Sequence, residues 1–448
     1  MRFLSTYQPL KVAVIGLGYV GSCIAATLAD RGVDIVGVDA DTQLIKELNN
    51  DYCRFHEPEL TRLLIGGIAS GRIRAQSDYA EVGTADVVLM TVGTPIHDDG
   101  ALADEQLRGA CLELSRHLRE GQLVMVKSTV PPGTTRSLVL PMLEHSGLVG
   151  GRHFGLAFAP ERLAEGTALH ELRTLPIVVG GLDADSARDA EEFWRRALDV
   201  ETIRLNSLES AEIVKLANNW WIDLNVALAN ELAKFCALFE VDVMDVIAAA
   251  NTITKGSGNV NILLPSVGVG GLCLTKDPWM VWRSAREHGL EIRTVSTSRE
   301  VNSGMPEYTA QLVVDELANL GKDPAEATIA VLGLAFKNNT GDLRATPTQQ
   351  TVAELAKVVA EVRIFDPLVD VGQAEETFGI RPSVTLHETV RDADCIAILA
   401  LHREFENIDF TMLPVAMSCL IVDGRAHYSK EKIASLHEMG YRYRGVGR

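Results

Sequence analysis

A glycine-rich turn near the start of the chain constrains the fold more than any other feature. The apolar run 11–15 has the length of a strand, and the hexapeptide GLGYVG follows it directly at 16–21. Residues 22–31 have a helical composition, and a second apolar run, 34–38, ends at Asp39. A strand, a Gly-x-Gly-x-x-Gly turn, a helix and a second strand ending in an acid form the first half of a doubly wound α/β domain that binds a dinucleotide.

The position of the acid indicates which dinucleotide binds. Asp39 lies 23 residues after Gly16 (39 − 16 = 23), close to the roughly 20 residues that separate the phosphate turn from a ribose-binding acid. The alternative is a turn that only connects a strand to a helix, and in that case the position of the acid would be a coincidence. The carboxylate would bond a free 2′-hydroxyl and repel a 2′-phosphate, which favours NAD over NADP. We therefore expect NAD to contact Gly16, Gly18, Tyr19, Val20, Gly21 and Asp39.

Later apolar runs end in polar turns of a similar kind. The run 86–92 leads to the tripeptide Gly93-Thr94-Pro95, and the run 123–126 leads to KSTVPPG at 127–133. A third run, 155–158, leads to PERLAEG at 160–166. Ligands of open parallel sheets bind at the carboxyl ends of the strands. We therefore expect Thr94 and Thr129 to line the cofactor crevice, although threonine and proline also end strands for structural reasons alone.

The sequence changes character from residue 207 to about 240. This stretch contains EIVKLANN at 212–219 and has no glycine or proline, which predicts a long, largely buried helix. Lys215 and Asn219 are four residues apart and share a face of that helix, although a lysine on an apolar helix often only extends its ammonium to solvent. Trp220, Trp221 and their apolar neighbours exceed what one domain needs to bury, so we expect a homodimer through this helix.

The pattern of apolar runs and turns returns after residue 321. Residues 328–335 repeat the pattern of 12–18, residues 362–366 that of the run ending at Asp39, and residues 394–401 that of 86–93. Ala335 and Asn338 replace two of the turn glycines, so we do not expect a second NAD site. Lys337 and Arg344 suit phosphate or uracil-ribose contacts, with solvated surface charge as the alternative. The predicted fold class is α/β, with two doubly wound Rossmann-like parallel-sheet domains, 1–206 and 319–448, joined by a central helical domain, 207–318.

We expect the central helical domain to carry one loop that combines glycines with a cysteine, GVGGLCLTKDP at 268–278. Glycine lets a ligand lie directly against the backbone. The charge of Lys276 favours the thiolate of Cys273, which is the nucleophilic form, and Asp277 could accept a proton or position a water. A buried cysteine that packs in a glycine-rich turn is the structural alternative.

The overall composition excludes several classes of partner. The chain has 448 residues and a net charge of −18, which argues against a nucleic-acid or anionic-membrane surface. Its seven cysteines form neither a Cys-x-x-Cys pair nor a metal-binding spacing, so we expect no metal and a reducing, cytoplasmic location. We expect no signal peptide, and no apolar run approaches the ~18 residues of a membrane span.

These residues together resemble the UDP-glucose/GDP-mannose dehydrogenase superfamily, the nucleotide-sugar 6-dehydrogenases. The resemblance runs from Gly16 to about Asp423 and is carried by GLGYVG, KSTVPPGTT, Pro160-Glu161, EIVKLANN, GVGGxCxxKD and AFK at 335–337. It implies two NAD-linked oxidations of a sugar C6 alcohol to a carboxylate, for cell-surface polysaccharide precursors.

The resemblance also implies roles for individual residues. Cys273 would be the nucleophile, Lys215 and Asn219 would steady the oxyanion, and water and proton transfer would fall to Asp277, Thr129 and Glu161. Lys276 would contact the cofactor. The UDP-sugar would contact Glu161, Arg162, Leu163, Lys215, Asn219, Gly270, Phe336, Lys337 and Arg344.

The motifs disagree about the sugar. Enzymes acting on N-acetylhexosamines often have histidine where this chain has Leu272, and Lys276-Asp277 also favours UDP-glucose. PERLAEG at 160–166 is closer to the N-acetylhexosamine group. We expect UDP-N-acetylmannosamine or a related 2-acetamido sugar, with UDP-glucose as the alternative.

Two other classes of protein share parts of this pattern. A β-hydroxyacid dehydrogenase would need neither the second α/β domain nor a cysteine nucleophile. A non-catalytic NAD-binding protein would have no use for Lys215, Cys273 and Asp277 together.

Overall fold

The computed structural model describes residues 2–4, 10–256 and 258–448. The chain folds into two compact units, of which the first comprises residues 1–218 and 280–290 and the second comprises residues 219–279 and 291–448. The predicted boundaries of three domains, near residues 206 and 318, remain a proposal. We describe each unit by itself.

The first unit is built on an eight-stranded sheet with the order β3-β2-β1-β4-β5-β6-β7-β8. The first six strands pair in parallel, in the order found in dinucleotide-binding domains, whereas β7 is antiparallel to β6 and β8 is parallel to β7. The strands are β1 (Lys11–Ile15), β2 (Asp34–Val38), β3 (Ile73–Gln76), β4 (Val87–Met90), β5 (Leu123–Val126), β6 (Gly155–Phe158), β7 (Ile177–Gly181) and β8 (Thr202–Leu205).

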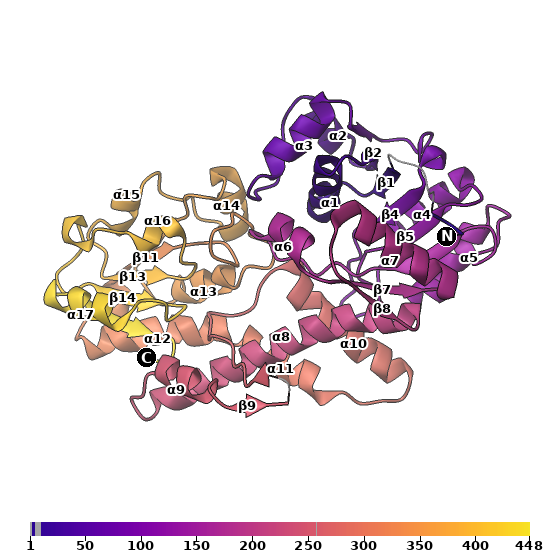
Figure 1. Ribbon diagram of the computed structural model, residues 1–448. Coiled ribbons are helices and arrows are strands. Elements are labelled where there is room, and N and C mark those ends of the chain that lie inside the picture. The colour runs from indigo at the N-terminus through magenta and orange to yellow at the C-terminus, as the bar shows by residue number, and fades with distance from the viewer. Residues whose placement is uncertain (1, 5–9, 257) are drawn as a thin grey trace. The chain divides into compact units, whose positions relative to one another are not determined.

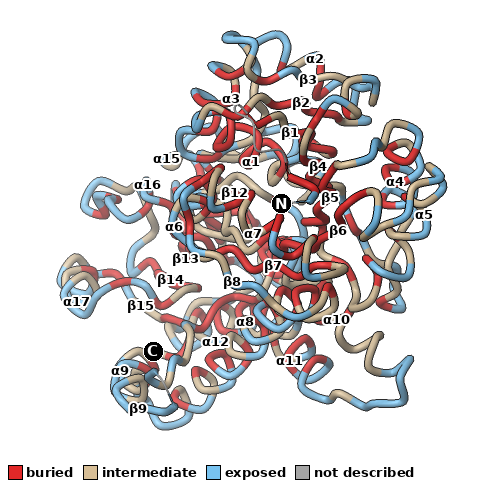
Figure 2. Tube along the Cα trace, turned by 45° about the vertical axis from the view of Figure 1, so that its right-hand side comes forward, coloured by how far each residue is buried: buried red, intermediate tan, exposed pale blue. Residues whose placement is uncertain are grey.

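Alternate side chains of these strands enter two separate cores, as expected for a sheet covered on both faces. Val12 and Val14 of β1 pack with α1 (Tyr19–Asp30), α2 (Thr42–Asn49), α3 (Leu60–Ala69), α6 (Ala168–Thr174) and α7 (Ala184–Leu198). Ala13 and Ile15 pack on the other face, with α4 (Glu105–His117), α5 (Leu140–Glu144) and the first turn of α8 (Leu208–Ala237). Strands β4, β5 and β6 are buried at every residue (Figure 2).

The second unit contains a five-stranded parallel sheet with the order β12-β11-β13-β14-β15. Figure 1 labels β11, β13 and β14 of this sheet. Its strands are β11 (Thr328–Leu332), β12 (Glu361–Phe365), β13 (Cys395–Ile398), β14 (Leu420–Asp423) and β15 (Arg442–Gly445). One face is covered by α12 (Met305–Asn319), α13 (Pro347–Leu355) and α14 (Val371–Phe378), and the other by α15 (Leu386–Val390), α16 (Arg403–Glu406) and α17 (Lys430–Glu438). The prediction of two doubly wound α/β domains is confirmed.

Between the two sheets the sequence is mainly helical, as predicted. After the 30-residue helix α8 come α9 (Val243–Ala250), α10 (Leu272–Glu287) and α11 (Arg293–Ser303), with a two-stranded hairpin of β9 (Thr254–Lys255) and β10 (Gly258–Asn259). The buried carboxylate of Asp223 on α8 accepts hydrogen bonds from Arg299 at 2.7 Å and Asn302 at 2.9 Å, both on α11. Among the described residues, no helix combines the length and apolar character needed to cross a bilayer.

Candidate active site

The three glycines of the first turn have three different roles. Gly16 has a φ of +96°, and a Cβ there would lie 2.8 Å from the carbonyl oxygen of Thr91. A Cβ on Gly21 would lie 1.8 Å from the carbonyl oxygen of Gly16, so α1 packs directly on the turn. Gly18 has no atom within 4 Å of its Cβ position. A phosphate can therefore approach the backbone here, at the N-terminus of α1, where peptide N–H groups favour an anion.

Asp39 follows β2, where the sequence places it, and its carboxylate is held by the backbone. Its Oδ2 accepts the N–H of Leu17 at 2.6 Å, and its Oδ1 accepts the N–H of Asp41 at 2.8 Å. The half-buried carboxylate is thereby fixed beside the glycine turn. The open backbone at Gly18 and the acid at Asp39 together fit NAD.

Glu57 belongs to this site although no motif predicted it. Its Oε2 accepts the hydroxyl of Tyr19 at 2.5 Å and the N–H of Gly166 at 2.6 Å. Burial, reinforced by this hydrogen bond, raises the pKa of Tyr19 far above its ordinary range. Glu57 therefore joins the cofactor turn to the segment 160–166, and only the folded structure shows this connection.

The two predicted threonines lie at the same edge of the sheet. Thr94 is buried after β4, and Thr129 is half-buried after β5, and these strands are neighbours. The hydroxyl of Ser128 donates to the carbonyl of Val92 at 2.7 Å, which ties the two turns together. Both turns therefore lie at the carboxyl edge of the sheet, one after β4, the neighbour of β1, and the other after β5.

Glu161 lies just beyond β6, and its two carboxylate oxygens have different surroundings. Oε1 accepts the N–H groups of Arg162 at 2.7 Å and Leu163 at 3.0 Å. Oε2 is buried, lies 3.5 Å from Nζ of Lys127, and accepts no hydrogen bond from any described residue. The side chain of Arg162 donates to the carbonyl of Pro176, whereas Leu163 packs against the core. One oxygen of Glu161 is thus fixed and the other is available as an acceptor.

Lys215 and Asn219 lie one turn apart on α8, as predicted. Lys215 is only 7% exposed, so it does not simply extend its ammonium to solvent. Asn219 is also buried, and its Nδ2 donates to Oδ2 of Asp277 at 2.5 Å. Nζ of Lys276 donates to Oδ1 of the same carboxylate at 2.5 Å. Asp277 is fully buried, and each of its two carboxylate oxygens accepts one hydrogen bond.

Cys273 is the second residue of α10 and not part of a loop, which corrects the predicted position. The first turn of a helix has N–H groups without helical partners and a partial positive charge, which favours an anion there. Cys273 is also exposed. Its exposure does not agree with the alternative of a buried packing cysteine.

The glycines before Cys273 allow close packing against the C-terminal α/β domain. A Cβ on Gly270 would lie 2.5 Å from the carbonyl oxygen of Ala345 and 2.6 Å from Cβ of Phe336. Gly271 has a φ of +79°, and a Cβ there would lie 2.9 Å from the ring of Phe336. We expected these glycines to leave room for a ligand. The structure shows that the space at Gly270 and Gly271 is occupied by Ala345 and Phe336 of the same chain.

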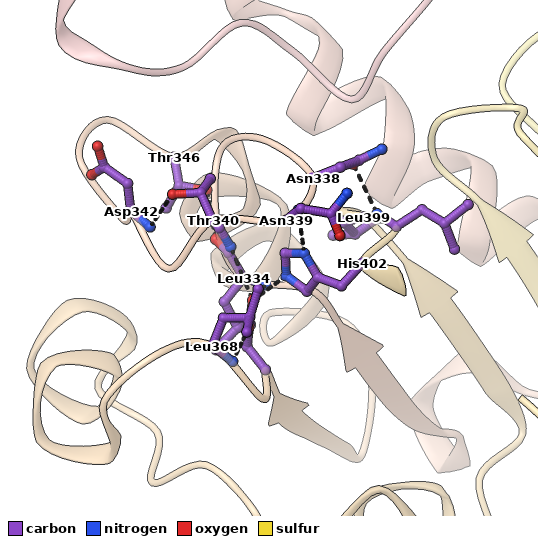
Figure 3. Close-up of polar contacts among 12 residues, drawn as sticks. Leu334, Asn338, Asn339, Thr340, Asp342, Thr346, Leu368, Leu399 and His402 are labelled. Atoms are coloured by element: carbon purple, nitrogen blue, oxygen red, sulfur yellow. Dashed lines mark hydrogen bonds and ion pairs between the residues drawn. The ribbon is translucent and has the colours of Figure 1, made fainter. Parts of the chain in front are cut away.

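The corresponding turn of the second sheet is closed by its own side chains (Figure 3). Asp366, which follows β12 as Asp39 follows β2, accepts the N–H of Leu334 at 2.7 Å and bonds Nε2 of His402 at 2.9 Å. Nδ1 of His402 accepts the N–H of Asn339 at 2.8 Å, so Nε2 carries the proton toward Asp366. The acid is buried and engaged within the protein. This agrees with the prediction that the turn is not a second NAD site.

The cations predicted for this domain lie in its loops. Lys337 is half-buried, whereas Nε of Arg344 donates to both carboxylate oxygens of Asp342, at 2.8 and 2.9 Å. Arg425, which was not predicted, is half-buried after β14 and donates to the carbonyl of Phe336 at 2.8 Å. Burial lowers the pKa of Arg425 to about 10. Arg425 thus fixes the backbone of the segment that carries Lys337.

Family models match three consecutive parts of the chain. They describe the NAD binding domain at residues 10–198, the central domain at 209–304 and the UDP binding domain at 330–430 of the UDP-glucose/GDP-mannose dehydrogenase family. The chain belongs to this family. It is therefore an NAD-dependent oxidoreductase, a nucleotide-sugar 6-dehydrogenase, and its UDP binding domain implies a UDP-sugar substrate. A β-hydroxyacid dehydrogenase or a non-catalytic NAD-binding protein does not account for these matches.

Relatives with two different sugar specificities are similar to almost the whole chain. The UDP-N-acetyl-D-mannosamine dehydrogenase of Pyrococcus horikoshii is 34% identical over 441 residues, 98% of this chain and 99% of the relative. A solved structure of the UDP-D-ManNAc dehydrogenase from this organism has a TM-score of 0.87 at 32% identity, covering 98% of this chain and 99% of that chain. The UDP-glucose 6-dehydrogenase of Haloferax volcanii is 32% identical over 426 residues, 93% of this chain and 96% of the relative.

Proposed function

We propose that this enzyme oxidises the C6 alcohol of UDP-N-acetylmannosamine, or of a related UDP-N-acetylhexosamine, to the uronic acid. Two observations support this sugar, the segment PERLAEG at 160–166 and the similarity to the Pyrococcus horikoshii enzyme along 98% of the chain. UDP-glucose is the second candidate, favoured by Lys276-Asp277 and by the relative from Haloferax volcanii.

The exposed Cys273 in the first turn of α10 is the observation that carries the proposed mechanism. NAD, when bound, accepts one hydride in each of the two oxidations. The thiolate of Cys273 adds to the aldehyde carbon that the first oxidation produces, and loss of the second hydride converts the adduct into a thioester. Water then attacks the thioester, the C–S bond breaks, and the uronic acid and the thiolate are released.

The other residues are proposed to handle protons and charge. Oε2 of Glu161, which has no hydrogen-bond donor among the described residues, takes up the proton of the reacting hydroxyl or water, and the hydroxyl of Thr129 relays it. Lys215 and Asn219 stabilise the oxyanion. Asp277, held by two donors, keeps Asn219 in place and assists water transfer.

We propose that the remaining predicted residues bind the two ligands. Lys276 contacts the cofactor. The UDP-sugar contacts the segments that contain Arg162, Leu163, Gly270, Phe336, Lys337 and Arg344.

We also propose that the enzyme is a homodimer through α8. Trp221, Leu224, Leu228 and Phe235 are exposed on this helix, and their spacing places them along one face. Exposed apolar surface of this extent is typical of an interface, and two copies of the helix would cover it in a symmetric dimer.

An NADH-production screen over UDP-N-acetylmannosamine, UDP-N-acetylglucosamine, UDP-N-acetylgalactosamine and UDP-glucose tests the substrate. We expect the highest kcat/KM with a 2-acetamido sugar. A higher kcat/KM with UDP-glucose would reject the proposed sugar but not the mechanism. The Cys273→Ser variant separates the two, because it should lose uronic acid formation with every sugar.

A further inference from the structure

Lys127 is a buried cation that no predicted role uses. It follows β5, and its side chain is only 2% exposed. Its Nζ donates to the carbonyl of Ala159 at 3.1 Å and lies 4.7 Å from the ring centroid of Trp194. A lysine is almost never fully buried without a charged partner, so we expect a carboxylate neighbour to pair with it.

That neighbour is Glu161, whose Oε2 lies 3.5 Å from Nζ of Lys127. At this distance the attraction is that of an ion pair, since N–H···O hydrogen bonds are usually 2.7–3.2 Å long. Oε1 of Glu161 is already fixed by two backbone N–H groups. The ammonium therefore supplies positive charge to Oε2 while leaving its lone pairs available to a water or a substrate hydroxyl.

The groups around Lys127 shift its pKa in opposite directions. Burial lowers the pKa of Lys127, and the cations Lys215 and Arg162 lower it further, whereas Glu161 acts in the opposite direction. Cys23 on α1 also faces Glu161, and burial raises the pKa of its thiol, so it adds no charge. Lys127 is the cation that forms an ion pair with the available oxygen of Glu161.

We propose that Lys127 is a positioning residue that holds Oε2 of Glu161 toward the reacting groups. Strands β5 and β6 are paired neighbours, and each contributes one member of the pair just beyond its carboxyl end. The ring of Trp194 on α7 closes the site of the ammonium, which restricts Lys127 to this position. This inference rests on the proposed role of Glu161 as proton acceptor.

Three variants test the inference, namely Lys127→Met, Glu161→Gln and the double variant. Lys127→Met has a similar length without the charge, and we expect kcat to fall about 10- to 100-fold, as for a misplaced catalytic group. The KM for the UDP-sugar and the Kd for NAD should change little. Lys322→Met, which removes a lysine paired with Asp394 at 2.7 Å, is the matched control.

The double variant shows whether Lys127 acts through Glu161. If it does, Lys127→Met should have no further effect on kcat once Glu161 is glutamine, because the two changes remove one shared function. This comparison uses only Glu161→Gln and the double variant, so it can be made even if Lys127→Met alone fails to fold. A further fall of tenfold or more in the double variant would overturn the inference.

The failure of the inference can be distinguished from the failure of the proposed mechanism. If Glu161→Gln keeps the wild-type kcat, the proposed role of Glu161 is wrong. If Glu161→Gln is slow but Lys127→Met keeps the wild-type kcat, only the role of Lys127 is wrong.

Discussion

Replacing Gly18 with alanine should weaken NAD binding without unfolding the protein. Gly18 has φ −57° and ψ −172°, a conformation that alanine adopts without strain. As the N-cap of α1, alanine is less favourable than glycine by under ~1 kcal/mol. The loss of freedom in the unfolded chain offsets this by about 0.4–1 kcal/mol. The free energy of unfolding should therefore stay within ~1 kcal/mol of wild type.

The effect on the cofactor should be larger. Because no atom lies within 4 Å of the Cβ position of Gly18, the new methyl would occupy the space through which a phosphate approaches the backbone. Inserting a methyl into a packed contact costs about 1–3 kcal/mol, which corresponds to roughly a 5- to 150-fold increase in Kd.

Gly21→Ala is the contrasting variant. Its Cβ would lie 1.8 Å from the carbonyl oxygen of Gly16, and backbone cannot move aside as a side chain can. We expect destabilisation of about 3 kcal/mol or more, visible as a lower Tm even without NAD.

Titration calorimetry with NAD and thermal unfolding followed by circular dichroism measure the two effects. A wild-type Kd of NAD for Gly18→Ala would show that the cofactor phosphates do not lie against the backbone at Gly18. A fall in Tm equal to that of Gly21→Ala would show that the open space is needed for folding and not for binding.

Three further predictions concern the cofactor, the assembly and acid stability. Because Asp39 would face a 2′-phosphate, kcat/KM should be at least ~100-fold lower with NADP than with NAD, and equal values would reject the role of Asp39. Leu228 is 50% exposed on α8, so Leu228→Lys should convert a dimer into a monomer by light scattering at micromolar concentration, and a monomeric wild type would contradict this. The hydrogen bond from Arg136 lowers the pKa of Glu209 from 4.5 to about 2, so this pair stabilises the fold above pH ~4.5 and the effect is lost as the pH falls toward 2. Urea unfolding should show a stability difference between wild type and Glu209→Gln at pH 7 that shrinks by pH 3, and a difference that grows would refute the assignment.

Strands buried on both faces could be predicted from the sequence because they are apolar at almost every position. This is why β1, β4, β5 and β6 were found. Strands β3 and β8 were missed because they lie at the edges of the sheet and their sequences, IRAQ and TIRL, are half polar. The antiparallel strand β7 ends in two glycines, which weakened its pattern.

The site could be predicted where a motif holds its members close in sequence. The turn at Gly16 and the pair Lys215 and Asn219 are of this kind. The helical position of Cys273 was missed because the preceding glycines and Pro278, which lies inside α10, hide the helical pattern. Lys127 looked like a turn residue, since only the folded sheet brings Glu161 to it from the next strand.

The central claim is that Cys273 carries the sugar as a thioester between two oxidations. The most direct test measures NADH released per uronic acid formed, with the UDP-sugar limiting, in wild type and in Cys273→Ser. The account predicts two NADH per sugar for the wild type. It also predicts that turnover to uronic acid in the variant falls by several orders of magnitude, since a serine hydroxyl is a far weaker nucleophile near neutral pH. One NADH per sugar in the wild type, or uronic acid from the variant at near wild-type rate, would contradict it.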